Sequence, residues 1–512
     1  MAYSVIIKNG TIIDGTGSAP FAGDIGIKKD VISKIGDLSQ ETADFVFDAA
    51  GLTVSPGFID ITNHSDVYGT IFYASLQESL LTQGISTILL GNCGESLAPL
   101  AKIESLSGLE RWTNLPINAD WNSVEEYFKS LEKNGIGVNC ATLVGQETLL
   151  RNSDDPKGRL FLLEKSLEEG ALGLSSNFSF HYLTEILKEE TKIFLKKIKK
   201  ANGIYKIHLR DEGKDFLPAV AFAVELARQS GVLTVISHFK AVGKDAWADF
   251  DKAINIIEIA RKDGVNVSFD VFPYLRTGSQ LIALLPLWAK AGDMKDIVRK
   301  LSDLKSLEHI LDYLRSITLH SDRILIASAF KDKNIVGKSL KAISEDYGKS
   351  PEETIIEILK ANNLNVTIFG RSIFQENLIT AIKKEYSCVS SDGAGYNLSF
   401  EKTHDFVHPR SFGAFPRFIS KIARSANLTL EEAVKKVTSI PAAMLGLENR
   451  GILKKNFIAD INVFDSNNFK DASTYLNPYK YSSGVRCLLI SGDPAFLDGQ
   501  FLGKFGRIIK KA

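Results

Sequence analysis

Two stretches in the middle of the chain, IYKIHLRDEG at 204–213 and VLTVISHFKAVG at 232–243, decide the fold prediction. Each begins with an apolar run of strand length, and each run ends at a histidine, His208 in the first and His238 in the second. A helical pattern over 215–230 separates them. Buried strands that alternate with helices are typical of a parallel α/β sheet.

The same alternation continues outward in both directions. Helical patterns lie between apolar runs, for example at 159–169, 185–201 and 249–263. Eight strands with helices between them predict a (β/α)₈ TIM barrel, although a doubly wound open sheet would also fit the alternation. The strand count and the placement of polar residues favour the barrel. The predicted strands are 52–60, 86–92, 137–143, 171–176, 204–208, 232–238, 265–272 and 386–392.

The two ends of the chain have a different texture. Short strands broken by tight turns such as Asn9-Gly10 run through 1–52, and the same texture returns from about 449. We therefore expect a β-sandwich domain from 1–52 plus 449–512 and a catalytic barrel over 53–448. A helical insertion at about 276–375, after the seventh strand, is too long for a plain loop. A lid and a packing appendage are both open interpretations of it.

Composition limits the classes of partner. The 512 residues include 61 basic and 61 acidic side chains, so the formal net charge is zero and no nucleic-acid partner is indicated. The four cysteines form no CxxC pair, and a disulfide framework is not expected. The start is not typical of a signal peptide, and no apolar run is long enough to span a membrane. We expect a cytoplasmic protein with a small-molecule substrate; the sequence leaves the oligomeric state open.

Metal-ligating residue types stand where the predicted strands end. They are His64, Cys93, His208, His238 and Asp392, and in a (β/α)₈ barrel these strand ends face one active-site mouth. A single histidine is usually structural. Metal-ligating residue types at the ends of several different predicted strands are less easily explained by chance. Cys93 as an inert buried thiol and Asp392 as a helix cap or turn residue also stay open.

The chemistry of these residues indicates a zinc hydrolase. Cysteine and histidine are good zinc ligands, and three protein ligands with one open position are typical of catalytic zinc. Zinc lowers the pKa of bound water to roughly 7 and polarises a carbonyl. Asp392 is the candidate to take the water proton and return it to a leaving nitrogen.

Seven motifs together carry a resemblance that covers nearly the whole chain. In this order the chain resembles the N-acyl-D-amino-acid deacylase branch of the amidohydrolase superfamily. The stretches 337–353 and ADINVFD (459–465) resemble the family's insertion and the closing strand of its sandwich. The motifs are GFIDITNHSD (57–66), GNCG (91–94), HLRDEG (208–213), SHFK (237–240), DVFPY (270–274), SSDG (390–393) and HPRSFGAFPR (408–417).

The resemblance implies roles for single residues. The family's tightly bound Zn²⁺ is held by a cysteine and two histidines, which match Cys93, His208 and His238, and its catalytic aspartate matches Asp392. The arginine of its HPR motif binds the substrate carboxylate and matches Arg410, a role that suits a bidentate guanidinium. A salt-bridge arginine is the alternative there. Ser279 is the candidate for a serine that helps to hold the carboxylate.

The chain departs from the family pattern at two places. The family carries HxH after GFID, whereas here the first position is Thr62 and only His64 remains. Threonine is a poor zinc ligand, so a second, weaker metal site is in doubt, while His64 is expected to contact the metal, the attacking water or the oxyanion. The family also places a substrate-contacting tyrosine near LSSNFSFHY (174–182), and no residue there aligns with it clearly.

Three hypotheses for function follow. The first is zinc-dependent hydrolysis of N-acyl-D-amino acids or related N-acyl compounds. The second is a cyclic-amide hydrolase of the same superfamily, of the hydantoinase or dihydroorotase type. The third, motivated by Thr62, is a weakly active or non-catalytic relative. Metal content separates the third from the others, and a substrate panel separates the first two.

Overall fold

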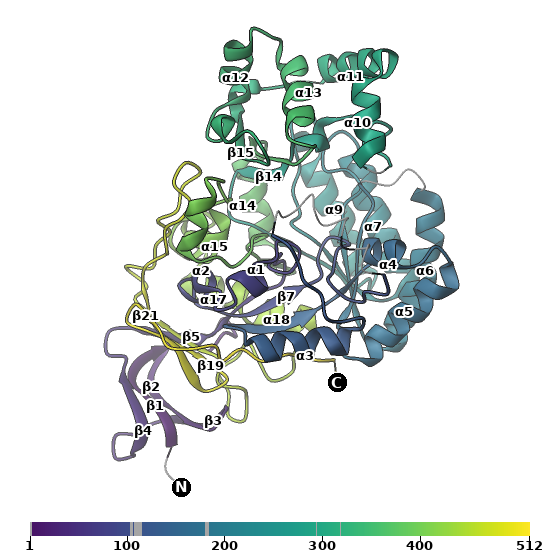
Figure 1. Ribbon diagram of the computed structural model, residues 1–512. Coiled ribbons are helices and arrows are strands. Elements are labelled where there is room, and N and C mark those ends of the chain that lie inside the picture. Colours follow the sequence, from purple (N-terminus) through teal and green to yellow (C-terminus); the bar gives the residue numbers. More distant parts are fainter. Residues whose placement is uncertain are drawn as a thin grey trace.

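A computed structural model describes residues 3–102, 106, 115–179, 184–292, 294–317 and 319–511. Figure 1 shows three parts: a barrel in the middle, a sheet built from strands of the N-terminal and C-terminal regions, and a mixed insertion on the opposite side. The barrel carries the predicted site residues on the ends of its strands, so its construction determines the site.

Parallel strands in sequence order form the barrel. Each pairs with the next in parallel, and an isolated bridge between Asn63 and Gly393 joins the last strand to the first. With β8 and β9 counted as one interrupted strand, the described residues contain the eight predicted strands, which confirms the (β/α)₈ barrel. These strands are β6 (Phe58–Asp60), β7 (Ile85–Leu90), β8 (Asn139–Thr142), β9 (Val144–Gly145), β10 (Gly173–Asn177), β11 (Ile204–His208), β12 (Leu233–Ile236), β13 (Val267–Val271) and β17 (Ser387–Val389).

Helices between the strands cover the outside of the barrel (Figure 1). Helix α7 illustrates why: Phe216, Val220, Ala223 and Ala227 recur every three or four residues and are all buried. None of the described helices is long and apolar enough to cross a membrane. The helices of this layer are α3 (Val124–Asn134), α4 (Gln146–Asn152), α5 (Pro156–Glu168), α6 (Thr184–Lys200), α7 (Phe216–Ser230), α8 (Lys244–Ala248), α9 (Phe250–Lys262), α14 (Gln375–Lys383), α15 (Arg410–Arg417), α17 (Leu430–Val437) and α18 (Ser439–Leu445).

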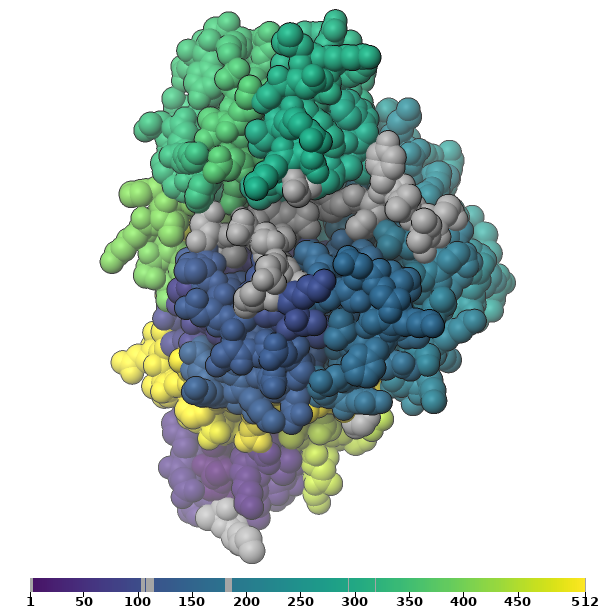
Figure 2. Space-filling model, turned by 45° about the vertical axis from the view of Figure 1, so that its right-hand side comes forward, coloured from purple at the N-terminus to yellow at the C-terminus, as the bar shows by residue number. Residues whose placement is uncertain are grey.

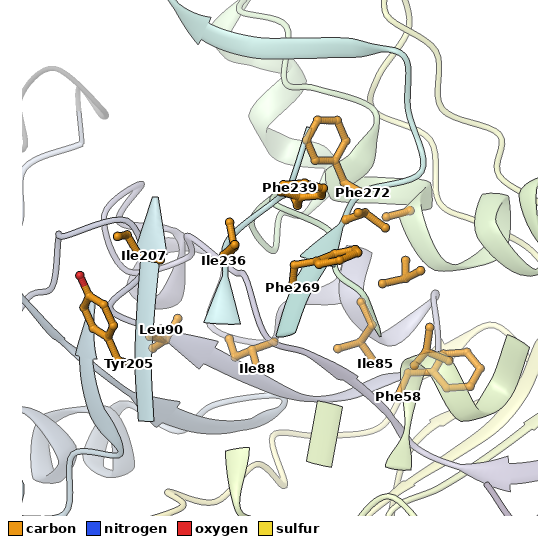
Figure 3. Close-up of a cluster of buried hydrophobic side chains, with 14 of the residues drawn as sticks. Phe58, Ile85, Ile88, Leu90, Tyr205, Ile207, Ile236, Phe239, Phe269 and Phe272 are labelled. Carbon is orange, nitrogen blue, oxygen red and sulfur yellow. The ribbon is translucent and has the colours of Figure 1, made fainter. Parts of the chain in front are cut away.

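The largest buried apolar cluster joins the barrel strands to these helices. Figure 3 shows part of it, with side chains contributed by β6, β7, β11, β12 and β13. Phe58 and Phe269 are fully buried, and each such side chain stabilises the fold by about 1.5–3 kcal/mol relative to exposure. This packing makes the strand ends a rigid frame for the polar residues that follow them.

The sheet at the other end of the molecule combines strands from the first 56 residues with strands from 461–501. Its order is β21-β20-β19-β18-β5-β1-β2-β3, with β4 paired to β1. The predicted strand 52–60 is divided: β5 joins this sheet, β6 joins the barrel, and Gly57 lies between them, where an added Cβ would meet Ser86 Oγ at 2.3 Å. The strands are β1 (Tyr3–Ile12), β2 (Phe21–Lys28), β3 (Val31–Gly36), β4 (Ala43–Asp48), β5 (Thr53–Pro56), β18 (Ile461–Phe464), β19 (Val485–Ile490), β20 (Asp493–Leu497) and β21 (Gln500–Phe501).

The insertion follows β13 and has a core of its own. Figure 2 shows its surface at the end of the molecule away from the terminal sheet. Besides the expected helices it contains an antiparallel sheet, β14-β16-β15, which the helical periodicity did not predict. The helical stretch 294–316 is divided into two helices, because Asp303 caps the second. The elements are β14 (Arg276–Gln280), α10 (Met294–Ser302), α11 (Leu304–Ser316), β15 (Ile324–Ala329), α12 (Leu340–Tyr347), α13 (Pro351–Ala361) and β16 (Val366–Arg371).

Candidate metal centre and active site

The metal-ligating residue types lie at one end of the barrel. His208 is the last residue of β11, and Cys93, His238 and Asp392 each follow the end of their strand by two or three residues. His64 follows β6 at the first strand. In a parallel barrel all these positions are at the carboxyl ends, where loops from different strands converge.

Three of these side chains form a compact donor cluster. The candidate ligand atoms of Cys93, His208 and His238 all lie within 4.8 Å of one another, and Cys93 Sγ is 3.2 Å from His238 Nε2. The Nδ1 atom of His208 is buried and has no hydrogen-bond partner among the described residues. A sulfur and two imidazoles at this spacing suit Zn²⁺, whose bonds to sulfur and nitrogen are about 2.0–2.3 Å. The donor set therefore fits one zinc ion with an open position.

Three of the site residues have strained backbone conformations. Cys93, His238 and Asp392 have φ angles of 53°, 38° and 52°, in the left-handed region that side chains other than glycine rarely adopt. Such conformations cost about 1–3 kcal/mol each and persist where the surrounding structure imposes them. Here they turn each side chain from the end of its strand toward the common centre.

Charge stabilises the ionised forms of the donors. Burial alone would raise the pKa of the Cys93 thiol, but His238 and hydrogen bonds from both histidines hold it well below its usual value. Burial and Lys240 lower the pKa of His238, whereas the charges of Cys93 and Asp392 raise it to about 10. These interactions favour the thiolate of Cys93 and the protonated ring of His238. A thiolate is also the form that binds zinc.

Asp392 lies between His64 and Arg410. Its Oδ1 is 3.1 Å from His64 Nε2, and its Oδ2 accepts a hydrogen bond from the Arg410 guanidinium. Burial would raise the pKa of this carboxyl, but Arg410 and His238 hold it well below its ordinary value. Burial lowers and Asp392 raises the pKa of His64, which reaches about 9 with the added contribution of Cys93.

His238 is supported by Lys240 and Glu212, which belong to the motifs SHFK (237–240) and HLRDEG (208–213). Lys240 Nζ lies 2.9 Å from His238 Nδ1 and 2.5 Å from Glu212 Oε1. The same Glu212 oxygen is 3.2 Å from His238 Nδ1. A carboxylate behind the distal ring nitrogen orients a metal-binding imidazole, so Glu212 has the position of such a support.

A buried polar network under the site was missed at the sequence level. Asp270 Oδ1 accepts hydrogen bonds from the His238 backbone N–H at 3.0 Å and from Ser390 Oγ at 2.6 Å. Its Oδ2 accepts one from Thr62 Oγ1 at 2.9 Å and lies 3.3 Å from Lys206 Nζ. Lys206 stands in IYKIH two residues before His208, and a lysine inside an apolar strand was the signal available.

Arg410 is held as the first residue of α15. Its backbone N–H donates to His408 Nδ1 at 3.1 Å, and its guanidinium lies over the Phe272 ring at 5.0 Å. The side chain is buried, and its Nε has no partner among the described residues. Asp392 therefore does not saturate the N–H donors of the guanidinium.

Ser279 lies apart from this group. On β14, an added Cβ at Gly278 would be 3.6 Å from Arg410 Nη2, so the face of Gly278 meets the site. Neighbouring strand residues point to opposite faces, and Ser279 pairs with Ile368, a core residue of the insertion. The structure thus directs Ser279 away from Arg410. The sequence also leaves open which residue of 174–182 matches the family's substrate-contacting tyrosine. Of that stretch, Phe180, His181 and Tyr182 lie outside the described residues.

Known proteins resemble this chain in fold and over nearly its whole length. N-acyl-D-glutamate deacylase from Alcaligenes xylosoxydans xylosoxydans is 30% identical over 522 residues, covering 99% of this chain and 96% of that protein. The crystal structure of N-acyl-D-glutamate deacylase from Bordetella bronchiseptica, complexed with zinc and a phosphonate inhibitor, has a TM-score of 0.83 at 25% identity and 100% coverage of both chains. A D-aminoacylase structure described by its binuclear metal centre has a TM-score of 0.82 at 26% identity, covering 99% of this chain and 100% of that one. No family model matches the sequence.

Proposed function

Given that this chain belongs to the N-acyl-D-amino-acid deacylase family of metal-dependent amidohydrolases, we propose that it hydrolyses the amide bond of N-acyl-D-amino acids, releasing a carboxylate and a D-amino acid. The observation that carries the proposal is the cluster of Cys93, His208 and His238 beside the Asp392–Arg410 pair. The cluster of Cys93, His208 and His238 can hold a metal ion. The ion pair provides a base, Asp392, and a carboxylate-binding group, Arg410.

Cys93, His208 and His238 would hold one Zn²⁺. When bound, the ion supplies a Lewis acid for the acyl carbonyl and lowers the pKa of a coordinated water to roughly 7. Glu212 and Lys240 keep the His238 ring oriented from behind. The Asp270 carboxylate fixes the backbone of the same residue, so both ends of this ligand are supported.

Asp392 is the proposed general base and then the general acid. It accepts a proton from the attacking water on one carboxylate oxygen and delivers it to the leaving nitrogen as the amide bond breaks. Its low pKa leaves it ionised at neutral pH, ready to accept. His64, whose Nε2 lies 3.1 Å from Oδ1, holds the carboxylate in place.

Arg410 is the proposed anchor for the substrate's α-carboxylate. A guanidinium binds a carboxylate through two parallel hydrogen bonds, which also fixes the direction of the amide. The relatives include enzymes named for D-glutamate as well as a general D-aminoacylase, so acidic and neutral D-amino acids are both candidate substrates.

Metal content and a substrate panel test the proposal together. Purified protein should contain one zinc per chain and release amine from N-acetyl-D-glutamate, N-acetyl-D-aspartate or N-acetyl-D-methionine. The L-isomers and dihydrouracil, a cyclic amide, are the controls. Asp392→Asn should retain its zinc and lose about 10²- to 10⁴-fold in kcat, the usual contribution of general acid–base catalysis. Turnover of dihydrouracil alone would instead support the cyclic-amide alternative, and a zinc-free protein that added metal does not restore would support the non-catalytic one.

A further inference from the structure

A buried ammonium group lies on the floor of the proposed site. Lys206 is 0% exposed, although lysine is almost never fully buried unless it is paired. Its Nζ donates to Thr62 Oγ1 at 2.5 Å and to the Ile61 carbonyl, and it lies 3.3 Å from Asp270 Oδ2. An ammonium has three N–H donors, so these three acceptors satisfy it completely. The group is a fixed cation built into the barrel.

The position of this cation relates it to the metal centre. Lys206 and His208 are two residues apart on β11, so their side chains share the face that points into the barrel. Its counter-ion, Asp270, holds the backbone N–H of His238, and the Thr62 carbonyl accepts the backbone N–H of Asp392 at 2.9 Å. Asp270 therefore links the ammonium to His238, and Thr62 links it to Asp392.

The hydroxyl of Thr62 is a neutral, weak metal ligand that is already held in two hydrogen bonds. It accepts a hydrogen bond from Lys206 and donates one to Asp270. The position is the one that carries the first histidine of the HxH pattern in the resemblance described above. A divalent ion bound here would meet a neutral, occupied hydroxyl and the positive charge of Lys206. The residues present do not fit a second metal.

We infer that Lys206 is an internal cation that takes the place of a second metal ion, so that the protein binds one zinc per chain and no second. This inference rests on the proposed zinc site of Cys93, His208 and His238. It adds that the exchange of histidine for Thr62 is matched by a permanent charge on the opposite strand. Asp270, which would otherwise be an unpaired carboxylate, is neutralised by the side chain rather than by an ion.

The decisive measurement is zinc per chain by elemental analysis, after equilibrium dialysis of the full-length protein against increasing zinc. The wild type should stop at one equivalent even in a large excess. Two equivalents in the wild type would overturn the inference while leaving the proposed function in place. No bound zinc would instead remove the proposed zinc site itself, so the two failures are distinct. This arm needs no variant and does not depend on activity.

Variants then ask whether Lys206 is the cause. Thr62→His alone should remain at one equivalent, because the ammonium is still present. Thr62→His combined with Lys206→Met should gain a second equivalent, and circular dichroism shows whether each variant is folded. A folded double variant that stays at one, or a single Thr62→His variant that binds two, would contradict the assignment of Lys206. If the double variant does not fold, the wild-type dialysis and the Thr62→His variant decide the question.

Discussion

The side chains of Arg410 and Asp392 form a buried ion pair in which the guanidinium donates a hydrogen bond to Oδ2 of the carboxylate. The group proposed to bind the substrate's carboxylate thus already binds a carboxylate of the protein. Its Nε is buried and has no partner among the described residues, so the carboxylate of Asp392 does not use all the donors of the guanidinium. Arg410 can thus position the substrate directly beside the base.

Replacing Arg410 with lysine keeps the positive charge but removes the planar guanidinium that can make two parallel hydrogen bonds to a carboxylate. We expect kcat/KM for the best N-acyl-D-amino acid to fall about 10- to 150-fold, the equivalent of about 1.5–3 kcal/mol for a hydrogen bond to a charged group. The loss should be mainly in KM. An N-acyl amine without the carboxylate is the matched substrate, and both enzymes should cleave it equally slowly. A large difference on that substrate would mean that Arg410 acts on the base rather than on the substrate.

Cys93 should be the reactive thiol of the metal-free protein. Burial raises the pKa of the thiol, but His238 and hydrogen bonds hold it well below the ordinary value, whereas burial raises the pKa of Cys140, Cys388 and Cys487. Iodoacetamide at pH 7 should therefore alkylate Cys93 first, as peptide mass spectrometry can show. One equivalent of zinc should prevent the reaction. Alkylation at an unchanged rate in the presence of zinc would argue against Cys93 as a ligand.

Asp270 should be more important for stability than an isolated buried aspartate. Asp270→Asn leaves the Lys206 ammonium without its counter-ion, and breaking a buried pair in this way costs about 3–5 kcal/mol. Thermal unfolding should therefore shift strongly downward. The control is the double variant Asp270→Asn with Lys206→Met, whose destabilisation should be smaller than the sum of the two single changes. Additive effects would show that the two groups are not coupled.

Lys436 should make stability rise between about pH 8 and pH 10. Its Nζ is buried and donates to the carbonyl oxygens of Lys384 and Ser387, and burial lowers its pKa to about 8. The unfolded chain keeps this proton up to about pH 10.4, so between the two values the unfolded state binds more protons and loses stability relative to the folded state as pH rises. The gain is at most about 3 kcal/mol. Urea unfolding midpoints of the wild type and Lys436→Met, compared at pH 7.5 and 10, measure it; parallel behaviour of the two proteins would contradict the assignment.

Strand patterns and strand-end residues were sufficient to predict the barrel and the positions of its polar side chains. The apolar runs of β11 and β12, and the histidines at or just after their ends, can be recognised from the local sequence alone. The division of 52–60 at Gly57 was not visible, because both halves are apolar and only their partners differ. The role of Lys206 was hidden for a similar reason: its three acceptors come from residues 61, 62 and 270, which only the closed barrel brings together. The insertion's sheet was missed because its strands are separated by helices of stronger periodicity.

The pairing of N-terminal with C-terminal strands in one sheet has a consequence for synthesis. β5 pairs with β18, and about 400 residues separate the two strands, so the partner leaves the ribosome roughly 20 to 80 s after β5 at ordinary translation rates. During that interval the edge of β5 presents unpaired backbone groups that can join another nascent chain. Translation pauses in the second half of the message would lengthen this exposure. The yield of folded protein in a cell should therefore depend on the speed of translation and on chaperones that cover the unpaired edge of β5.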